Sequence, residues 1–307
     1  MSRLDIILPF YNGSKFIEEL LKSIQENDIG DLKIKFIIVN DASSESETKF
    51  LKSVLPTNHI YIENEKNLGV IRSVEIGLKA STSEYTMLSD QDDVWLPNKI
   101  KNSLRRLQSI EQDGPALVYT DLEIVGPNLE QKYPSMHGYY GDNHQGLNPS
   151  ILLHNVVTGC TIIMNRKLLN IALPFPAELT VHDHWIASCA VYSGRISVLN
   201  EITILYRQHG NNHTGAPDKR LVVKIRNWNV LYRRALLAFT QKVRMVKFLS
   251  ERMDFVGLEA QGMFLRDTYQ ALESNRLIYL INQKVITGTL MRIFLTSIIL
   301  IVRKRIK

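Results

Sequence analysis

The first 120 residues alternate short apolar runs with segments of helical periodicity, and this alternation constrains the fold more than any other feature of the chain. The runs are nearly continuous in apolar residues, as in FIIV at 36–39, which is typical of parallel strands buried on both faces. The segments between them carry apolar residues three and four positions apart, which indicates helices that pack on the sheet. The sequence predicts strands at 5–9, 36–39, 59–63, 85–89 and 117–120, and helices at 13–25, 47–54, 69–80 and 97–107.

The rest of the chain is less regular. Residues 126–148 are rich in Pro, Gly, Tyr, His and Asn without a clear period, which predicts a long loop. Strand character returns at 151–164 and, as a pair of strands, at 196–206, and the pattern after Pro217 is helical. We therefore expect an α/β fold with a Rossmann-like, mostly parallel sheet flanked by helices, organised as one domain over 1–216 and a helical C-terminal region over 217–307.

Composition narrows the function. The chain has 307 residues, 45% of them hydrophobic and 22% charged, which suits a globular protein with a large core. Its two cysteines, Cys160 and Cys189, form neither a disulfide framework nor a metal-type spacing, so a reducing compartment is expected. The N-terminal segment lacks the pattern of a secretory signal, and we expect a cytoplasmic protein. The net charge is +6, but the basic residues gather on the late helices without interleaved aromatic residues, so no nucleic-acid partner is expected.

The C-terminal end allows two interpretations. Residues 293–302 are almost wholly apolar and precede a basic tail, RKRIK. The run is about half of the ~20 residues that span a bilayer. It either lies in a membrane interface with its basic end toward anionic lipid, which would make the protein peripheral on the inner face of the cytoplasmic membrane, or forms a buried or homo-oligomer-forming helix with a solvated tail.

Three acids crowd the end of one predicted strand. Asp90, Asp92 and Asp93 follow the apolar run at 85–88, in the segment SDQDDVW. Ligands of parallel sheets bind beyond the carboxyl ends of the strands, and two carboxylates one residue apart project to the same side of an extended chain. Such a pair suits Mg²⁺ or Mn²⁺, which prefer oxygen ligands. The alternative is a solvated helix N-terminus, where acidic side chains suit the helix dipole.

Four segments occur together in a recognisable order: DIILPFYNGSKFIEELLKSI, FIIVNDASSE, NEKNLGVIRSVEIGLKAS and YTMLSDQDDVWLPNKI. In this order they resemble the N-terminal half of family 2 glycosyltransferases of the GT-A fold. The resemblance is dense over about the first 120 residues and continues at VTGCTIIMN, HDHW and YRQHGNN, of which the last two resemble the rhamnosyltransferase-type members. From about Pro217 onward it says little.

The resemblance implies a site for a nucleotide-diphospho-sugar. It places Pro9, Tyr11 and Asp41 at the nucleotide base, where Tyr11 can stack on the ring and Asp41 can accept a hydrogen bond from a pyrimidine imide N–H. Asp41 has a second interpretation as the N-cap of the following helix. Asn67 and Arg72 match the segment beside the base and ribose, and Arg72 is equally interpretable as an ordinary surface cation.

The resemblance also implies a metal site. Asp90 and Asp92 match the family's motif for metal, ribose and diphosphate, with Asp92 as the direct ligand of Mg²⁺ or Mn²⁺ and Asp90 as a contact to ribose or to a metal-bound water. Late in the domain, His209 is the candidate that completes the metal site, and Arg207 is a candidate diphosphate partner. The role of Asp93 is not assigned by its spacing.

The segment HDHW supplies the candidate base. Asp183 matches the family's base, which takes the proton of the acceptor hydroxyl as that hydroxyl attacks the sugar. A histidine pair for a metal, or a capped helix start, is the alternative for the same residues. Gly159 and Trp185 match the acceptor side, with Trp185 either forming an apolar wall against the sugar or packing beneath the site. We interpret Cys160 as a packed thiol, since no activating partner is evident.

Together these residues imply an inverting glycosyltransferase. The expected reaction moves a sugar, taken as rhamnose on a dTDP carrier, to a glycan acceptor on a lipid carrier, in the synthesis of a bacterial surface polysaccharide such as an O-antigen or capsule. Two other functions stay open at this point: a non-catalytic scaffold subunit that binds sugar nucleotides, and a metal-dependent phosphohydrolase.

Overall fold

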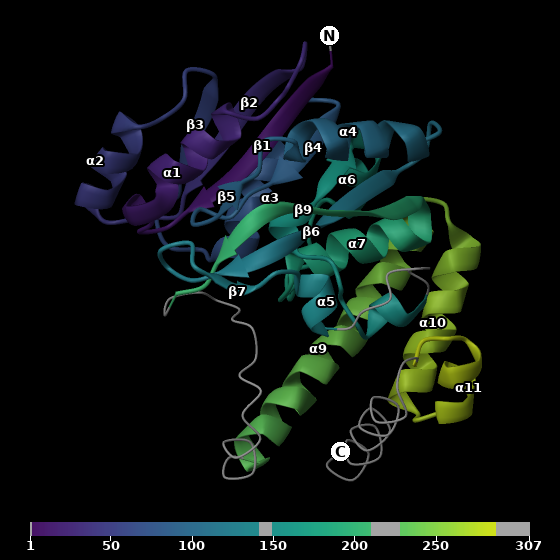
Figure 1. The fold of residues 1–307 in the computed structure, drawn as a ribbon. Helices are drawn as coiled ribbons and strands as arrows, with labels where there is room; N and C mark the ends of the chain where they lie inside the picture. The colour runs from purple at the N-terminus through teal and green to yellow at the C-terminus, as the bar shows by residue number, and fades with distance from the viewer. Residues whose placement is uncertain (1, 141–148, 210–227, 287–307) are drawn as a thin grey trace. The chain divides into compact units, whose positions relative to one another are not determined.

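The structure, a computed structural model, describes residues 2–140, 149–209 and 228–286 (Figure 1). Contacts divide the chain into two units, one formed by 1–144, 156–177 and 181–212 and the other by 145–155, 178–180 and 213–307. The predicted boundary between 216 and 217 lies outside the described residues and stays a prediction. The same holds for the apolar run at 293–302 and its basic tail.

The first unit is built on a mixed sheet of nine strands among the described residues. Its order is β3-β2-β1-β4-β8-β6-β9-β5, with β7 paired to β6. The strands from β3 to β4 run parallel, and so do β6 and β9, whereas β8, β5 and β7 pair antiparallel to their neighbours. The strands are β1 Arg3–Phe10, β2 Lys33–Asn40, β3 His59–Glu63, β4 Tyr85–Leu88, β5 Val94–Trp95, β6 Ala116–Val125, β7 Gln131–Tyr133, β8 Ile163–Asn165 and β9 Arg195–Arg207.

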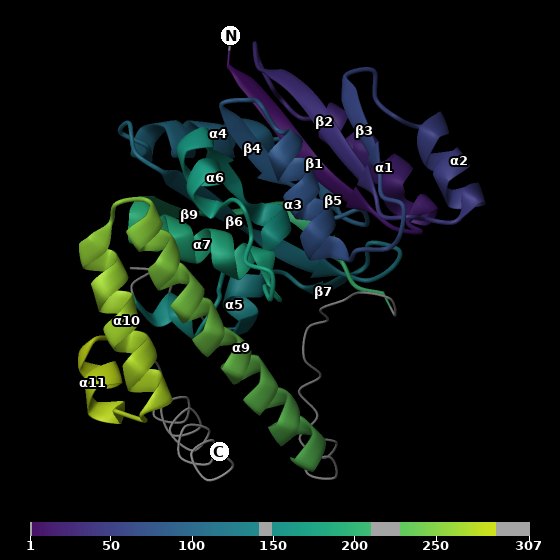
Figure 2. The same ribbon diagram turned by 180° about the vertical axis from the view of Figure 1, so that it is seen from behind.

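Helices flank this sheet, as Figures 1 and 2 show. Strand β1 is buried on both faces, with Leu4, Ile6 and Ile7 each 0% exposed, because helices cover both sides of a central parallel strand. Helix α1 buries Ile17 and Ile24, one apolar stripe at helical spacing. The helices of this unit are α1 Ser14–Gln25, α2 Glu45–Ser53, α3 Val70–Ala80, α4 Lys99–Ile110, α5 Met136–Tyr140, α6 Arg166–Ala172 and α7 His182–Ser193, with a 3₁₀ turn at Gly159–Thr161.

The second unit is helical. It comprises α9 Trp228–Phe255, α10 Glu259–Glu273 and α11 Leu277–Asn282, with a 3₁₀ turn at Pro149–Leu152. Helix α10 packs alongside α9 (Figure 2). Of the helices described in this chain, none combines the length and the apolar character that crossing a bilayer would require.

Two sequence predictions in the second half of the sheet were wrong. The expected pair of strands at 196–206 is one strand, β9, which bulges at Asn200 and Glu201: Thr120 of β6 is opposite Leu199, and the next partner, Asp121, is opposite Ile202. The polar residues of the bulge imitate a turn in the sequence pattern. The expected strand at 151–164 is mostly 3₁₀ and irregular chain, and only Ile163–Asn165 forms a strand. The expected loop at 126–148 contains β7 and α5 in its described part.

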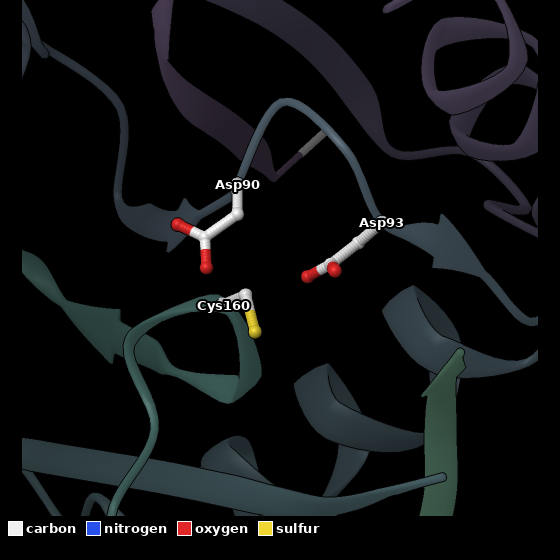
Figure 3. A group of neighbouring side chains, drawn as sticks. All are labelled: Asp90, Asp93 and Cys160. Carbon is white, nitrogen blue, oxygen red and sulfur yellow. The ribbon is translucent and has the colours of Figure 1, made fainter. Parts of the chain in front are cut away.

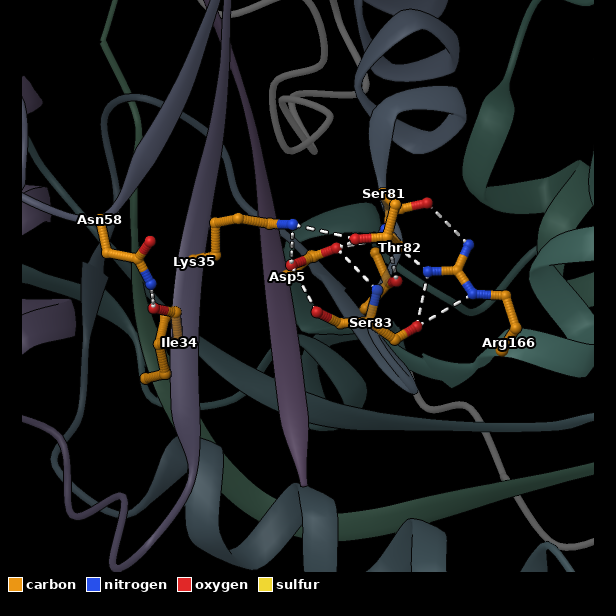
Figure 4. A network of polar contacts seen from close by, with 9 residues as sticks. Asp5, Ile34, Lys35, Asn58, Ser81, Thr82, Ser83 and Arg166 are labelled. Carbon is orange, nitrogen blue, oxygen red and sulfur yellow. Dashed lines mark hydrogen bonds and ion pairs between the residues drawn. The ribbon is translucent and has the colours of Figure 1, made fainter. Parts of the chain in front are cut away.

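A polar network joins the amino end of β1 to the start of β4 and α6 (Figure 4). The carboxylate of Asp5 is 0% exposed and accepts hydrogen bonds from both Ser81 and Ser83 side chains and from the Thr82 and Ser83 backbone N–H groups. Arg166 donates to the carbonyls of Ser81 and Ser83, and Lys35 Nζ lies 3.4 Å from Asp5 Oδ1. Burial raises the pKa of Asp5, but the hydrogen bonds outweigh it and hold that pKa below its usual value of 3.8.

Replacing Asp5 by Asn should therefore destabilise the sheet. We expect the free energy of unfolding to fall by about 3 kcal/mol, because an amide NH₂ would face donors in a site without water. The pKa of Asp5 is lower in the folded than in the unfolded chain, so its contribution is present above pH ~4 and is lost as the pH falls further. Urea unfolding at pH 7 measures the effect. The exposed Asp31→Asn variant is the matched control, and an equal loss in both variants would contradict the prediction.

Candidate active site

Three loops meet at the carboxyl ends of β1, β2 and β4. The Asp41 N–H donates to the Phe10 carbonyl, at 2.8 Å, so the loops after β2 and β1 lie side by side. The Gln91 amide joins the loop after β4 to the loop after β1: its Oε1 accepts from Tyr11 N–H at 2.8 Å, and its Nε2 donates to the Tyr11 carbonyl at 3.1 Å. Gly13 lies against the same amide, since a Cβ there would come within 2.4 Å of Gln91. Sequence reasoning missed Gln91, because its partner is 80 residues away.

Asp41 does not cap the following helix. The N-cap of α2 is Ser44, so the cap interpretation of Asp41 was wrong. Asp41 is 3% exposed and binds the loop before α3: Oδ1 accepts from Leu68 N–H and Oδ2 from Gly69 N–H, both at 2.8 Å. Gly69 has φ +83°, a left-handed conformation that a side chain would strain. Asp41 thus fixes the loop on which the resemblance places the base and ribose.

The other residues expected at the nucleotide differ in exposure. Tyr11 is 46% exposed, so its ring is accessible for stacking. Pro9 is half-buried at the end of β1, and Asn67 is exposed in the loop before α3. Arg72 pairs with Glu75 and donates through Nη2 to the carbonyls of Pro176 and Ala177, at 2.9 and 2.6 Å. These contacts contradict the interpretation of Arg72 as an ordinary surface cation.

The predicted metal ligands Asp92 and His209 are brought together. Asp92 Oδ2 lies 2.8 Å from His209 Nε2, although the two residues are 117 positions apart. Both side chains are partly exposed, at 14% and 19%, which leaves them accessible to a ligand. The His209 ring also stacks on Phe16, with 5.0 Å between the ring centroids.

Arg207 holds the loop of Asp92 in place, and its contacts are not those expected of a diphosphate ligand. The side chain is 3% exposed. Its guanidinium donates to the carbonyls of Asp92 and Pro127, pairs with the Glu19 carboxylate and lies over the Phe16 ring. A guanidinium buried among protein acceptors is a poor diphosphate ligand, so the expectation for Arg207 was wrong. Its contacts instead hold the backbone of the acid loop.

Asp183 and Asp90 approach each other from different elements. Asp183 lies in the first turn of α7, and its Oδ2 accepts from Gly159 N–H at 3.2 Å. A Cβ on Gly159 would lie 3.0 Å from His182 Nε2, so this chain segment packs closely on the start of α7. Burial raises the pKa of Asp90 to about 7, and the charges of Asp92 and Asp183 add to the shift. The three acids therefore share one strongly negative environment that a cation would stabilise.

Figure 3 shows Asp90 and Asp93 converging on the Cys160 thiol. One ligand atom of each lies within 4.8 Å of the others. Burial raises the pKa of Asp93 well above its usual value, with the charges of Asp90 and Asp92 next in importance, and burial likewise raises the pKa of the Cys160 thiol. A protonated, buried thiol agrees with the expected packed cysteine.

The predicted ligands Asp92 and His209 are in contact, and the group of three metal-type ligands that the described residues bring within 4.8 Å of one another is Asp90, Asp93 and Cys160. A carboxylate with an imidazole suits Mn²⁺ well and Mg²⁺ less well. Burial and the charges of Asp92 and Asp183 raise the pKa of Asp90 to about 7, and a bound cation would oppose this shift. The group of Asp90, Asp93 and Cys160 includes a thiol, which is a soft ligand, and both Asp93 and Cys160 are buried.

Trp185 is not part of an acceptor wall. The side chain is 0% exposed, and its Nε1–H donates to the Ala172 carbonyl at 2.8 Å. The expected contact with the sugar was therefore wrong, and the alternative in which Trp185 packs beneath the site is what the structure shows. The other acceptor-side candidate, Gly159, contacts Asp183.

The fold and these strand-end acids define a sugar-transferring enzyme of the GT-A type. The chain belongs to glycosyl transferase family 2, whose pattern matches residues 5–171. Similar proteins include the dTDP-rhamnosyl transferase RfbG of Shigella flexneri, 28% identical over 228 residues that cover 67% of this chain and 73% of that protein. The uncharacterized glycosyltransferase RP339 of Rickettsia prowazekii is 28% identical over 227 residues, which cover 71% of this chain and 68% of that protein.

Solved structures show the same fold. Residues 1–349 of TarS from S. aureus give a TM-score of 0.54 at 15% identity, covering 100% of this chain and 92% of that one. The mannosyltransferase PcManGT from Pyrobaculum calidifontis, in complex with GDP-Man and Mn²⁺, gives a TM-score of 0.54 at 16% identity, covering 98% and 86%. The predicted family and the predicted GT-A fold are both confirmed.

Proposed function

We propose that this chain is an inverting, metal-dependent glycosyltransferase that takes rhamnose from a nucleotide-diphospho-sugar, with dTDP-rhamnose as the first candidate. The observation that carries the proposal is the convergence of Asp90, Asp92 and Asp183 at one sheet edge, where burial first, and then the charges of Asp92 and Asp183, raise the pKa of Asp90 to about 7. The similarity to a dTDP-rhamnosyl transferase supports the choice of sugar. A mannosyltransferase of the same fold binds GDP-Man and Mn²⁺, which supports the donor class and the cation.

Each group has a separate task in the proposed reaction. Tyr11, Asp41 and the loop at Asn67 hold the base and ribose, and Asp90 contacts the ribose or a bound water. When bound at Asp92, Asp90 and His209, a divalent cation offsets the charge of the diphosphate leaving group. Arg72 acts indirectly: its hydrogen bonds to the carbonyls of Pro176 and Ala177 hold the 176–177 loop beside the proposed nucleotide site.

Asp183 then acts as the base. The acceptor oxygen forms a bond to the anomeric carbon while the bond from that carbon to the diphosphate breaks, and the hydroxyl proton passes to the Asp183 carboxylate. A single displacement inverts the anomeric configuration. The Gly159 N–H bond to Oδ2 orients the carboxylate, and the absent Cβ of Gly159 lets this segment pack closely on the start of α7.

The acceptor and the location of the enzyme are proposed from the sequence. A glycan on a lipid carrier, in the assembly of a surface polysaccharide, fits a cytoplasmic enzyme that meets the membrane surface through its basic C-terminal region. The apolar run at 293–302 supports such peripheral contact, and it also supports the alternative, association between copies of the chain.

A panel of sugar nucleotides tests the donor. With Mn²⁺ present, dTDP-rhamnose at about a hundredfold excess over its dissociation constant should stabilise the protein by ~2.7 kcal/mol and raise Tm by about 5–10 °C. UDP-GlcNAc and GDP-mannose should give much smaller shifts. The measurement is a thermal melt with and without EDTA. Equal shifts for all donors would reject the rhamnose assignment, and the same shift in EDTA would reject the cation.

A further inference from the structure

The proposed reaction leaves one polar side chain beside the candidate base without a task. His182 is the first residue of α7 and directly precedes Asp183. Its ring is half-buried and makes no hydrogen bond to any residue that the structure describes. Neither ring nitrogen is among the fully buried polar atoms that lack a partner, so both nitrogens keep some exposure to solvent. The imidazole is therefore open to a ligand on the acceptor side.

The start of α7 is the end of that helix that meets solvent. Val181, just before it, is 44% exposed, and His182 and Asp183 are half-buried. The residues from His184 to Ala190 are all buried. The segment HDHW thus places its first two side chains at the edge of the site and its last two in the core.

Gly159 contacts both of the side chains at that edge. A Cβ built on Gly159 would lie 3.0 Å from His182 Nε2 and 3.7 Å from Asp183 Cβ, so both residues pack against the same face of the glycine. The Gly159 N–H also donates to Asp183 Oδ2 at 3.2 Å. An imidazole and a carboxylate that flank one glycine are placed to contact neighbouring groups of one ligand.

The protonation state of His182 suits a hydroxyl ligand. Burial lowers the pKa of the imidazole, and the charge of Asp183 opposes that shift only in part. A neutral imidazole has one N–H donor and one lone-pair acceptor, so it can take either role toward a hydroxyl. A carboxylate that removes a proton and a neutral imidazole beside it match two adjacent hydroxyls of a sugar.

We propose that His182 is an acceptor-binding residue whose imidazole hydrogen-bonds the hydroxyl next to the one that attacks the donor. The enzyme would thereby select sugars with vicinal hydroxyls and turn the reacting one toward Asp183. The proposal rests on the proposed function and names its acceptor class, a vicinal diol. It also explains why position 159 is a glycine, since a Cβ there would displace the His182 ring.

His182→Phe in the full chain tests the contact. Phenylalanine keeps a flat ring against Gly159 but has no ring nitrogen, so the hydrogen bond is lost while the packing persists. The donor is dTDP-rhamnose with Mn²⁺, and octyl glycosides of glucose, galactose, N-acetylglucosamine and rhamnose are the probe acceptors. We expect kcat/KM for an accepted glycoside to fall about tenfold, chiefly through KM. The donor-induced Tm shift and the hydrolysis of the donor by water should stay within about twofold, because neither uses a second hydroxyl.

Two comparisons separate a ligand contact from packing. His182→Gln again offers a donor and an acceptor, and it should recover transfer to within about threefold of the parent. A glycoside without the hydroxyl beside the reacting one should lose about tenfold with the parent and almost nothing further with His182→Phe. The matched control is His59→Phe, at the amino end of β3, which should leave transfer unchanged.

Full transfer by His182→Phe overturns the proposal. Equal losses of transfer and of hydrolysis also overturn it, because His182 would then act on the donor or on the base. If His182→Phe does not fold, the deoxy glycoside decides: a tenfold loss with the parent that His182→Ala does not show supports the contact, and no loss with the parent overturns it. A parent that hydrolyses the donor but uses no glycoside overturns the acceptor class alone, whereas a parent that does neither overturns the proposed function.

Discussion

Asp183→Asn is expected to reduce sugar transfer by about a thousandfold or more while donor binding persists. The amide keeps the shape of the carboxylate and its one oxygen can accept from either Gly159 N–H or His184 N–H, but it cannot take the proton of the acceptor hydroxyl. The loss should appear in kcat, because the base acts on the acceptor in the transition state and not on the bound donor. Acceptor-dependent release of the nucleoside diphosphate measures transfer, and the donor-induced Tm shift measures binding.

The same variant separates the proposed enzyme from its rivals. The exposed Asp267→Asn change on α10 is the matched acid-to-amide control and should leave both readouts unchanged. If Asp183→Asn leaves glycan output in the cell intact, the chain acts as a scaffold. Release of phosphate with water alone, without an acceptor, would indicate a phosphohydrolase.

Asp92→Ala is expected to abolish the cation-dependent part of donor binding and to lower transfer at least about a hundredfold. Its Oδ2 is paired with His209, and both side chains are partly exposed, so removal of the carboxylate takes away the ligand that we propose binds the cation directly. Melting curves with dTDP-rhamnose over a Mn²⁺ titration measure the effect. Without donor or cation, the variant should melt within about 3 °C of the parent, since one acid of a crowded group has been removed.

A control on helix α1 tests whether loss of any acidic side chain would reduce the Mn²⁺ response. Glu18 is exposed on α1, and Glu18→Ala should keep the full Mn²⁺ response. An unchanged Mn²⁺ response in Asp92→Ala would show that the cation binds elsewhere, and the group of Asp90, Asp93 and Cys160 would then be the next site to test.

The first half of the fold was predictable because its signals are local. The strand at His59–Glu63 was placed at its observed bounds, and the helix predicted at 69–80 begins one residue later, at Val70, since Gly69 lies outside it as the N-cap. Apolar runs and helical spacing act over a few residues, and a parallel sheet uses both. At 151–164 the local signal misled: the β-branched residues suggest a strand, but Gly159 turns in a 3₁₀ geometry and its N–H binds the distant Asp183.

The residue types of the candidate site were predictable from the sequence, but the residues that hold them in position were not. The pairing of Asp92 with His209 was expected from the resemblance, and the structure brings the two side chains together. Gln91 and Arg207 were missed or misassigned because their contacts join positions 80 or more residues apart, which no local pattern encodes. The sequence left two roles open for Trp185, a wall against the sugar or packing beneath the site, and its complete burial decides for packing.

The Gln91 amide couples the loop after β4 to the loop after β1. Because it both donates to and accepts from the Tyr11 backbone, a displacement of the acid segment is transmitted to the Tyr11 segment, which we propose contacts the nucleotide base. A glutamate at 91 could still accept from Tyr11 N–H but would lose the donor to the Tyr11 carbonyl, which would weaken the coupling between the two loops. Binding of a nucleotide should then cost less conformational entropy in the parent protein than in Gln91→Glu. The donor should therefore dissociate more slowly from the parent protein than from the variant.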